Sequence, residues 1–235
     1  MTEDGKKVIM AIGGHIGDAE LTCGGVLATA SLRGEKIVTV AMTGGERGNP
    51  PHMSVADYRR QKEEEARTFA EMLGGEAVVF PYADGELPET DEVKFRLCDC
   101  IRQYRPDVLL THWKNSIHKD HMATHRIVID AQFYAGLASI ERPLPAHYAA
   151  GPYFAENWED AEGYVPYTYV EVTPEGFELW HKAISTHWFA VNSPSFHYRD
   201  YYATLMRLRG YLCRKEYAEA FTVSENHKRV VRTGF

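Results

Sequence analysis

A histidine and an aspartate stand three positions apart, just after the first apolar segment of the chain. That segment spans residues 8–12 and is followed by two glycines, and His15 and Asp18 come directly after them. Side chains at this spacing on a turn can face one point, and imidazole with carboxylate is a normal zinc-ligand pair. A plainer role also fits, because Asp18 is a suitable N-cap for a following helix. The glycines do not form a GxGxxG pattern, which argues against a dinucleotide-binding loop.

A second cluster of polar side chains follows a later apolar segment, at residues 107–111. Four of the eleven histidines lie within fourteen positions there, namely His112, His118, His121 and His125. In α/β proteins, ligands bind beyond the carboxyl ends of the strands, which is where this loop is expected. The plainer alternative is a solvated loop with a helix cap. The concentration of histidines favours a functional site.

Together the two clusters supply two imidazoles and one carboxylate, which leaves a metal coordination position open. An open position is typical of catalytic zinc sites, whereas structural zinc sites are closed. Water bound to such a metal has a lowered pKa and attacks carbonyl groups at neutral pH. The same ligand set also serves non-haem iron oxygenases. The alternation of strands and helices along the chain argues against that alternative.

Strand and helix signals alternate over the first 140 residues. This alternation predicts an α/β fold with a mostly parallel sheet, because right-handed crossover helices join parallel strands. Apolar and β-branched runs predict strands over 8–12, 36–43, 77–80 and 107–111, and helical spacing predicts helices over 18–32, 54–73, 92–104 and 121–137.

The last 95 residues differ, because they are rich in aromatic residues, proline and histidine. They predict a strand over 164–173 and helices over 175–186 and 198–212. No Gly/Ser-rich linker and no charge block separates this part from the rest. We therefore expect residues 1–235 to form one domain with an aromatic-rich C-terminal elaboration.

Composition narrows the class of protein. The formal net charge is −7, with 44% hydrophobic and 25% charged residues. A negative chain without a polybasic tract argues against nucleic acid or an anionic membrane as partner. No apolar stretch is long enough to span a bilayer, and the N-terminus lacks the pattern of a signal peptide. Four cysteines do not make a disulfide framework, so we expect free thiols in a reduced, cytoplasmic protein.

The two histidine clusters resemble the motifs of the LmbE-like, or PIG-L, family of zinc-dependent N-acetylglucosamine deacetylases. Residues 15–20 are similar to the family's His-Pro-Asp-Asp-x-Glu motif, and residues 118–121 match its later His-x-Asp-His motif. The resemblance implies a Rossmann-like sheet and hydrolysis of an N-acetyl group on a small amino-sugar substrate. It implies Zn²⁺ as cofactor, with Fe²⁺ as the alternative metal. It also suggests a homo-oligomer.

The same resemblance assigns roles to individual residues. It implies that His15, Asp18 and His121 are the metal ligands. It implies that His118 polarises the carbonyl group or stabilises the oxyanion. Asp120 is then the residue that orients His118.

One departure from the family motif affects the expected chemistry. The family has its general-base aspartate at the position of Gly17, which has no side chain. Loss of a general base typically lowers a rate by about 10²–10⁴. Three explanations are open: Glu20 replaces the base, His118 acts alone as base and acid, or the protein binds its ligand without turnover. We favour Glu20 as the substitute, although an acid in the first helical turn also stabilises the helix dipole.

Three further residues are candidates for substrate binding. Arg59 is a candidate for gripping substrate hydroxyls, with a solvated helix face as the alternative. Asp84 follows a predicted strand and is placed to reach a sugar hydroxyl, unless it only forms a turn. Trp113 is a candidate for stacking on a sugar ring, unless it packs the loop. Trp158, Trp180 and Trp188 are assigned to the core.

Overall fold

The computed structural model describes residues 5–159, 162–229 and 232. Its seven-stranded sheet has the order β3-β2-β1-β4-β5-β7-β6. The first five strands in this order are parallel, whereas β7 runs antiparallel to both β5 and β6. The strands are β1 (Val8–His15), β2 (Lys36–Thr43), β3 (Glu76–Tyr82), β4 (Val108–His112), β5 (Ala150–Ala155), β6 (Thr168–Val172) and β7 (Tyr217–Thr222).

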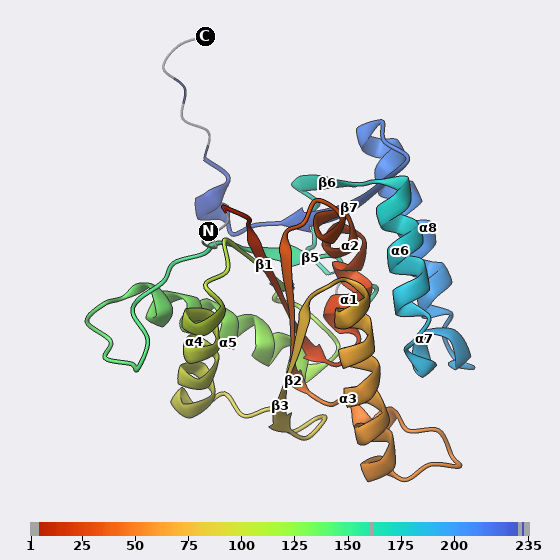
Figure 1. The fold of residues 1–235 in the computed structure, drawn as a ribbon, viewed down its shortest axis with the longest axis horizontal. Coiled ribbons are helices and arrows are strands. Elements are labelled where there is room, and N and C mark those ends of the chain that lie inside the picture. The colour runs from red at the N-terminus through yellow and green to blue at the C-terminus, as the bar shows by residue number, and fades with distance from the viewer. Residues whose placement is uncertain (1–4, 160–161, 230–231, 233–235) are drawn as a thin grey trace.

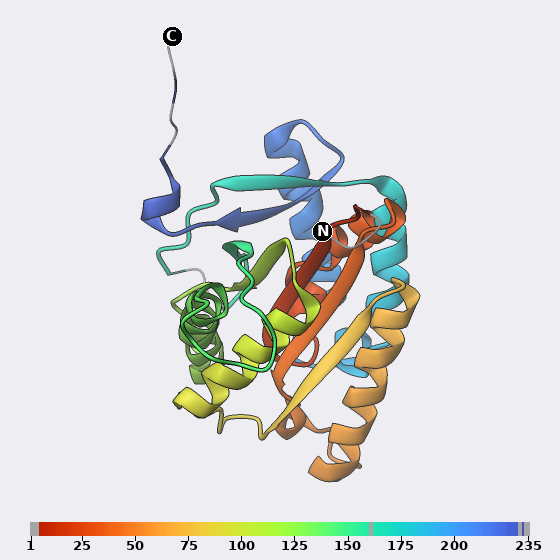
Figure 2. The ribbon, with the colours of Figure 1, turned by 60° about the vertical axis from the view of Figure 1, so that its left-hand side comes forward.

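Helices cover both faces of this sheet (Figures 1 and 2). Helices α4 and α5 cover one face, and α1, α2, α3, α6 and α8 lie on the other. The helices are α1 (Asp18–Thr22), α2 (Gly24–Leu32), α3 (Val55–Met72), α4 (Asp91–Tyr104), α5 (Lys119–Gly136), α6 (Pro174–Ile184), α7 (Trp188–Asn192) and α8 (Tyr198–Cys213), with short 3₁₀ turns η1 (Glu46–Gly48) and η2 (Glu225–His227). The α/β fold with a mostly parallel sheet is therefore confirmed. None of the described helices combines the length and apolarity needed to cross a bilayer.

Strand β1 explains how the sheet joins the two helical layers. Alternate side chains of a strand point to opposite faces, so Val8, Met10 and Ile12 join the core under α4 and α5. Ile9 and Ala11 join the core on the opposite face. Because β1 is buried on both faces, it reads in the sequence as a continuous apolar run.

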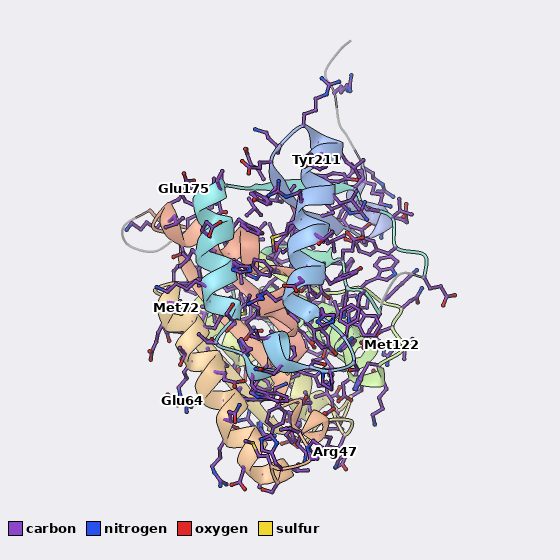
Figure 3. All side chains as sticks on the ribbon, turned by 90° about the vertical axis from the view of Figure 1, so that its right-hand side faces the viewer. Arg47, Glu64, Met72, Met122, Glu175 and Tyr211 are labelled. Carbon is purple, nitrogen blue, oxygen red and sulfur yellow. The ribbon has the colours of Figure 1, made fainter. Side chains whose placement is uncertain are left out.

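The aromatic C-terminal part completes the second helical layer. Figure 3 shows α6 and α8 side by side over the sheet, next to the long helix α3. Trp180 on α6 is fully buried, as predicted, and donates its Nε1–H to the carbonyl of Glu20 at 2.9 Å. Helix α6 thereby contacts α1, the short helix that begins just after β1.

The single helix predicted over 18–32 is wrong, because Cys23 separates α1 from α2. A Cβ on Gly24 would lie 2.3 Å from the Trp180 ring, so only glycine lets α6 pack this closely. The break frees backbone N–H groups at the start of α2. Glu219 accepts two of them, from Gly25 at 2.8 Å and from Val26 at 2.9 Å.

Two strands were not predicted, because each departs from the usual strand composition. Strand β5 contains glycine and proline, which are depleted in strands. Strand β7 carries Glu219 at its centre, yet all six of its residues are buried. The Glu219 carboxylate caps helix α2, and these hydrogen bonds compensate for burying a charged residue in a strand.

Glu219 makes the stability of the fold depend on pH. Burial raises the pKa of this carboxyl to about 8. The two backbone N–H groups favour the charged form and lower the pKa, but their effect is smaller than that of burial. The unfolded chain releases the proton near pH 4.5, while the folded chain keeps it until about pH 8. Stability is therefore lost as pH rises through this window. We expect the urea-unfolding midpoint to decrease as the pH is raised from 5 to 8. In Glu219→Gln, the loss in the free energy of unfolding over this range should be smaller by about 2–4 kcal/mol. The exposed Glu71→Gln should keep the wild-type slope.

Candidate active site

The two histidine clusters meet at the carboxyl edge of the sheet. Strands β1 and β4 are parallel neighbours, and the strand order turns outward on either side of them. This is the topological switch point, where open α/β sheets bind ligands. His15 is the last residue of β1, and Asp18 is the first residue of α1. His121 lies in the first turn of α5, so three elements converge here.

Three side-chain atoms from these elements lie at equal distances from one another. Asp18 Oδ2 lies 3.1 Å from His15 Nδ1 and 3.1 Å from His121 Nε2. The two nitrogen atoms are also 3.1 Å apart. Ligand atoms bound about 2.0–2.2 Å from one zinc ion lie roughly 3.0–3.5 Å from each other. The donor types and their spacing therefore fit a divalent metal.

His112, at the end of β4, supports this cluster from behind. Its Nε2 lies 3.1 Å from Asp18 Oδ2 and accepts the backbone N–H of Gly14 at 2.9 Å. Its ring stacks on His121 with a centroid separation of 4.1 Å. Because the lone pair of Nε2 is used by the Gly14 amide, it is not available to a metal, and we assign His112 to the support of His121 through ring stacking. The sequence drew attention to His112 but gave it no role.

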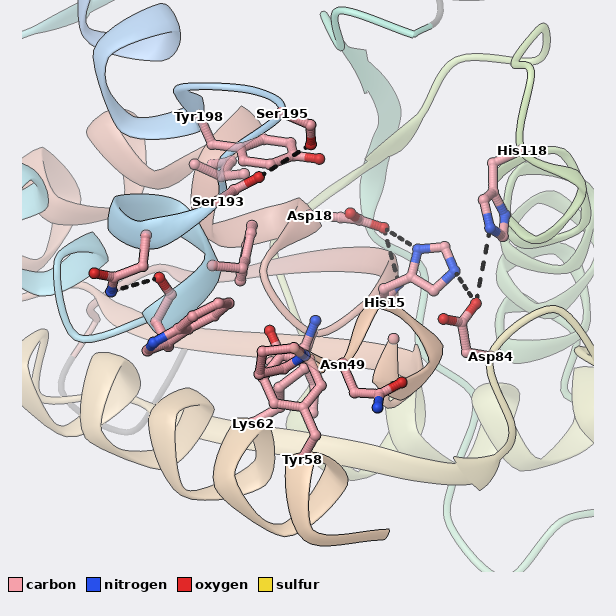
Figure 4. Close-up of a pocket in the computed structure, with 18 of the residues that line it drawn as sticks. His15, Asp18, Asn49, Tyr58, Lys62, Asp84, His118, Ser193, Ser195 and Tyr198 are labelled. Atoms are coloured by element: carbon pink, nitrogen blue, oxygen red, sulfur yellow. Dashed lines mark hydrogen bonds and ion pairs between the residues drawn. The ribbon is translucent and has the colours of Figure 1, made fainter. Parts of the chain in front are cut away.

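Carboxylates hold the far side of the His15 ring. His15 Nε2 lies 3.2 Å from Asp84 Oδ1 (Figure 4) and 3.5 Å from Asp120 Oδ2. Such partners fix the orientation of a metal-ligating histidine and increase its basicity. Burial tends to lower the pKa of His15, but the carboxylates of Asp18, Asp120 and Asp84 outweigh it and raise that pKa well above its usual value.

Asp84 contacts histidines, so its position differs from the one predicted for a substrate ligand. It lines the pocket, and its Oδ1 lies 3.2 Å from His15 Nε2 and 3.7 Å from His118 Nε2. Burial tends to raise the pKa of Asp84, but the hydrogen bond and charge of His15 lower it to about 2. This carboxylate therefore stays ionised and orients both rings.

His118 presents a hydrogen-bond donor to the pocket. Its Nδ1 accepts the backbone N–H of Asp120 at 3.2 Å, which places the ring proton on Nε2. Burial and the neighbouring rings of His15 and His121 lower the pKa of His118. The ring is therefore neutral near pH 7, with its Nε2–H directed at the pocket.

Asp120 does not orient His118 through its carboxylate, so that prediction needs correction. Its Oδ2 accepts the N–H of Gly85 at 2.6 Å, and its Oδ1 accepts the N–H of Leu87 at 3.4 Å. The carboxylate thereby ties the loop after β3 to His15. Only the backbone N–H of Asp120 reaches His118.

Gly17 closes the loop between His15 and Asp18, and an aromatic ring occupies the space beside it. Its φ of 107° lies in a region that favours glycine. A Cβ at this position would lie 2.4 Å from Cζ of Phe189 and 2.6 Å from its Cε1. Phe189 therefore fills the volume that a side chain at position 17 would need.

Glu20 lies behind this loop and away from the pocket lining. Its Oε2 accepts the backbone N–H of Gly17 at 3.0 Å, and the residue is 2% exposed. Burial raises the pKa of Glu20 to about 7. The observed contact is one half of a capping box, in which the N3 carboxylate accepts the N–H of the N-cap residue; Gly17 has no side chain to make the other half. This position argues against Glu20 as the substitute base.

The pocket above the metal-ligand cluster has a volume of about 640 Å³. Its floor contains His15, Asp18 and His121, and His118 and Asp84 stand at one side. Its walls come from the loop after β2, from α3, from the loop after β5 and from the C-terminal helices. They include Asn49, Tyr58, Lys62, Asn157, Trp158, Trp188, Phe189 and Tyr198.

The structure places Arg59 and Trp113 outside this pocket, which corrects two predictions. Arg59 donates to the carbonyls of Phe80 and Tyr82 at 3.0 Å and binds Glu63, so its guanidinium is occupied. Trp113 is 9% exposed and donates its Nε1–H to a backbone carbonyl in the 157–167 loop at 3.0 Å. Both side chains hold loops in place.

Several pocket residues were missed by the sequence analysis. Trp158 and Trp188 were assigned to the core but line the pocket. Lys62 had no assigned role, although a signal was available. It shares the buried face of α3 with Tyr58, Ala66 and Phe69, and a lysine on the apolar face of an amphipathic helix is unusual.

Comparison with known proteins supports one family. The model of the PIG-L family, described as GlcNAc-PI de-N-acetylase, matches residues 10–132. The chain is 26% identical to 4-oxalmesaconate hydratase of Pseudomonas putida over 218 residues, covering 87% of this chain and 80% of that protein. It is 28% identical to diacetylchitobiose deacetylase of Thermococcus kodakarensis over 141 residues, covering 58% of this chain and 53% of that protein.

Solved structures show the same fold. The 4-carboxy-2-hydroxymuconate hydratase of Pseudomonas putida superposes with a TM-score of 0.85 and 21% identity, covering 97% of this chain and 100% of that chain. The N,N'-diacetylchitobiose deacetylase of Pyrococcus horikoshii gives a TM-score of 0.81 and 21% identity, covering 98% of this chain and 88% of that chain. At this level of identity the likeness concerns the fold.

Proposed function

Because the chain belongs to the PIG-L family and is similar to deacetylases, an amidase and a hydratase, we propose that it is a metal-dependent N-deacetylase of a small amino-sugar-type substrate. The observation that carries this proposal is the set of three ligand atoms, each 3.1 Å from the others, on the floor of a pocket of about 640 Å³. A pocket of this size fits a small molecule.

The residues that would hold the metal are His15, Asp18 and His121. Zinc is the metal we propose, with Fe²⁺ as the alternative, since two imidazoles and one carboxylate suit both ions. When bound, the metal supplies a water of lowered pKa and polarises a carbonyl oxygen. Asp84 and Asp120 hold the ring of His15 in place, and Ser116 Oγ lies 3.1 Å from His121 Nδ1.

His118 is the residue that we assign to the developing negative charge. Its Nε2–H faces the pocket, and its neutral ring can donate a hydrogen bond to the substrate carbonyl oxygen as charge accumulates there. Asp84 Oδ1 lies 3.7 Å from this nitrogen, beyond hydrogen-bond distance, so the N–H is available to the substrate. We expect His118→Ala to lower kcat by about 10²–10³, whereas the exposed His227→Ala should not change it.

A second candidate function is hydration of an unsaturated carboxylic acid. The observation that favours it is Phe189 in the space beside Gly17, which leaves the loop from His15 to Asp18 without the base carboxylate of the deacetylase motif. The hydratase relative also aligns with 87% of the chain, more than the deacetylase relative does.

One experiment separates these functions. The metal content of the purified protein is measured, and the metal-loaded protein is assayed for acetate release from N-acetylglucosamine and N,N'-diacetylchitobiose. Unsaturated keto acids are assayed in parallel by the loss of their ultraviolet absorbance. Acetate release that His118→Ala abolishes supports deacetylation. Absorbance loss without acetate release favours hydration, and neither reaction from metal-loaded protein would contradict both.

A further inference from the structure

Lys62 brings a buried positive charge to the wall of the pocket. It lies on α3, is 5% exposed and lines the pocket beside Tyr58 (Figure 4). Removing an ammonium group from water costs several kcal/mol unless a partner compensates. Burial accordingly lowers the pKa of Lys62, and a partner within the protein or an anionic ligand would favour its charged form.

Among the residues that the structure describes, no carboxylate lies within 4.0 Å of Lys62 Nζ, so the protein itself gives it no ion pair. The ammonium group lies instead 4.7 Å from the centre of the Phe189 ring and 5.7 Å from that of Tyr58. Such cation–π contacts are worth about 0.5–2 kcal/mol, which is less than the cost of burial. Lys62 thus retains electrostatic capacity for a ligand.

Asp18 and Glu65 are the acidic side chains that most favour the charged form of Lys62, and neither forms an ion pair with it. Asp18 Oδ2 accepts the backbone N–H of His15 at 2.8 Å and lies 3.1 Å from three imidazole nitrogens. Glu65 Oε1 accepts from Gln61 at 2.7 Å and from the backbone N–H of Trp188 at 3.1 Å. Asp18 cannot move onto Lys62 without giving up its contacts, whereas Glu65 Oε2 is buried without a hydrogen-bond partner and still forms no ion pair with Lys62.

The ammonium group stands next to the metal-ligand cluster. A Cβ built on Gly45 would lie 2.8 Å from Lys62 Nζ and 2.8 Å from Cβ of His15, so both atoms border the same small volume. The Phe189 ring, which the ammonium group contacts, also fills the space beside Gly17. The pocket wall next to the His15–Asp18 loop therefore carries the Lys62 ammonium group against the ring of Phe189.

We propose that Lys62 binds a carboxylate of the substrate, so that the site selects an N-acetylated or unsaturated substrate that is also an acid. The reacting group of the substrate, an acetamide or a double bond, rests on the proposed function. The contact between Lys62 and a carboxylate does not, because it can be measured by binding alone. A lysine suits this role as a compact point charge that can turn its three N–H donors toward a carboxylate.

The test uses succinate as the probe, with binding measured by isothermal titration calorimetry on the full-length protein. Wild type should bind succinate, and Lys62→Met should bind it about 30-fold or more weakly, because truncating one partner of a buried charge pair is costly. Lys62→Arg should recover part of the affinity. The exposed Lys182→Met serves as the matched control and should bind like wild type.

Two further readouts separate this role from a structural one. The melting temperature of Lys62→Met should equal or exceed that of wild type, because replacing an unpaired buried charge by an apolar side chain is often neutral or stabilising. If the deacetylase assay is positive, N-acetylmuramic acid should have a lower KM than N-acetylglucosamine, and Lys62→Met should remove this difference. Wild type that does not bind succinate, or Lys62→Met that binds it equally well, would overturn the proposal whether or not the protein is active.

Discussion

Replacing Asp18 by asparagine is expected to remove the metal and with it any hydrolytic or hydration activity. The change keeps the shape of the side chain but deletes the negative charge that three imidazole nitrogens approach at 3.1 Å. Loss of a residue that only supports a metal ligand typically lowers metal affinity or activity by about 10–100-fold. Loss of the ligand itself should exceed that, so we expect metal affinity to fall more than about 100-fold.

Metal content is measured by inductively coupled plasma mass spectrometry, and metal affinity by a competition titration against a chelator. Asp91→Asn is the matched control, because its side chain is 77% exposed at the start of α4. His121→Ala should behave like Asp18→Asn, since it removes another of the three proposed metal ligands. If Asp18→Asn retained stoichiometric metal with wild-type affinity, the assignment of the ligand set would be wrong.

The sequence predicts the elements that carry the metal-ligand cluster because the relevant signals are local. The strand predicted over 36–43 has those bounds in the structure, and the run at 8–12 lies within β1. Parallel strands place their carboxyl ends at one edge of the sheet. Residues that follow β1 and β4 must therefore come close together, as His15, Asp18 and His121 do.

The walls of the pocket could not be predicted in this way, because they depend on contacts between distant segments. Phe189 meets Gly17 only because α7 folds back over the loop after β1. Trp113 and Arg59 have side chains suited to a sugar site. In the structure, both instead donate hydrogen bonds to backbone carbonyls outside the pocket. Local sequence gives the type of a side chain but not the direction in which packing turns it.

Replacing Gly17 by aspartate is expected to destabilise the protein and not to create an efficient deacetylase. The family motif alone would suggest that the substitution restores a general base. The structure opposes this for two reasons: the backbone has a φ of 107°, and a Cβ there would lie 2.4 Å from the Phe189 ring. Positive φ at a residue with a side chain costs of order 1–3 kcal/mol, and overpacking adds typically 1–3 kcal/mol. We expect a loss of about 2–5 kcal/mol in the free energy of unfolding.

A double-mutant cycle tests whether Phe189 is the cause. Phe189→Ala opens the space, so the cost of Gly17→Asp should be smaller in that background, and the two changes should be coupled by about 1–3 kcal/mol. Simple additivity in urea unfolding would show that Phe189 does not restrict position 17. The double variant also separates the two candidate reactions. If an aspartate with room to reach the pocket raises acetate release above the wild-type rate, only the missing base limits deacetylation. If it does not, the aromatic ring and the cation of Lys62 suit a different substrate, and hydration becomes the stronger candidate.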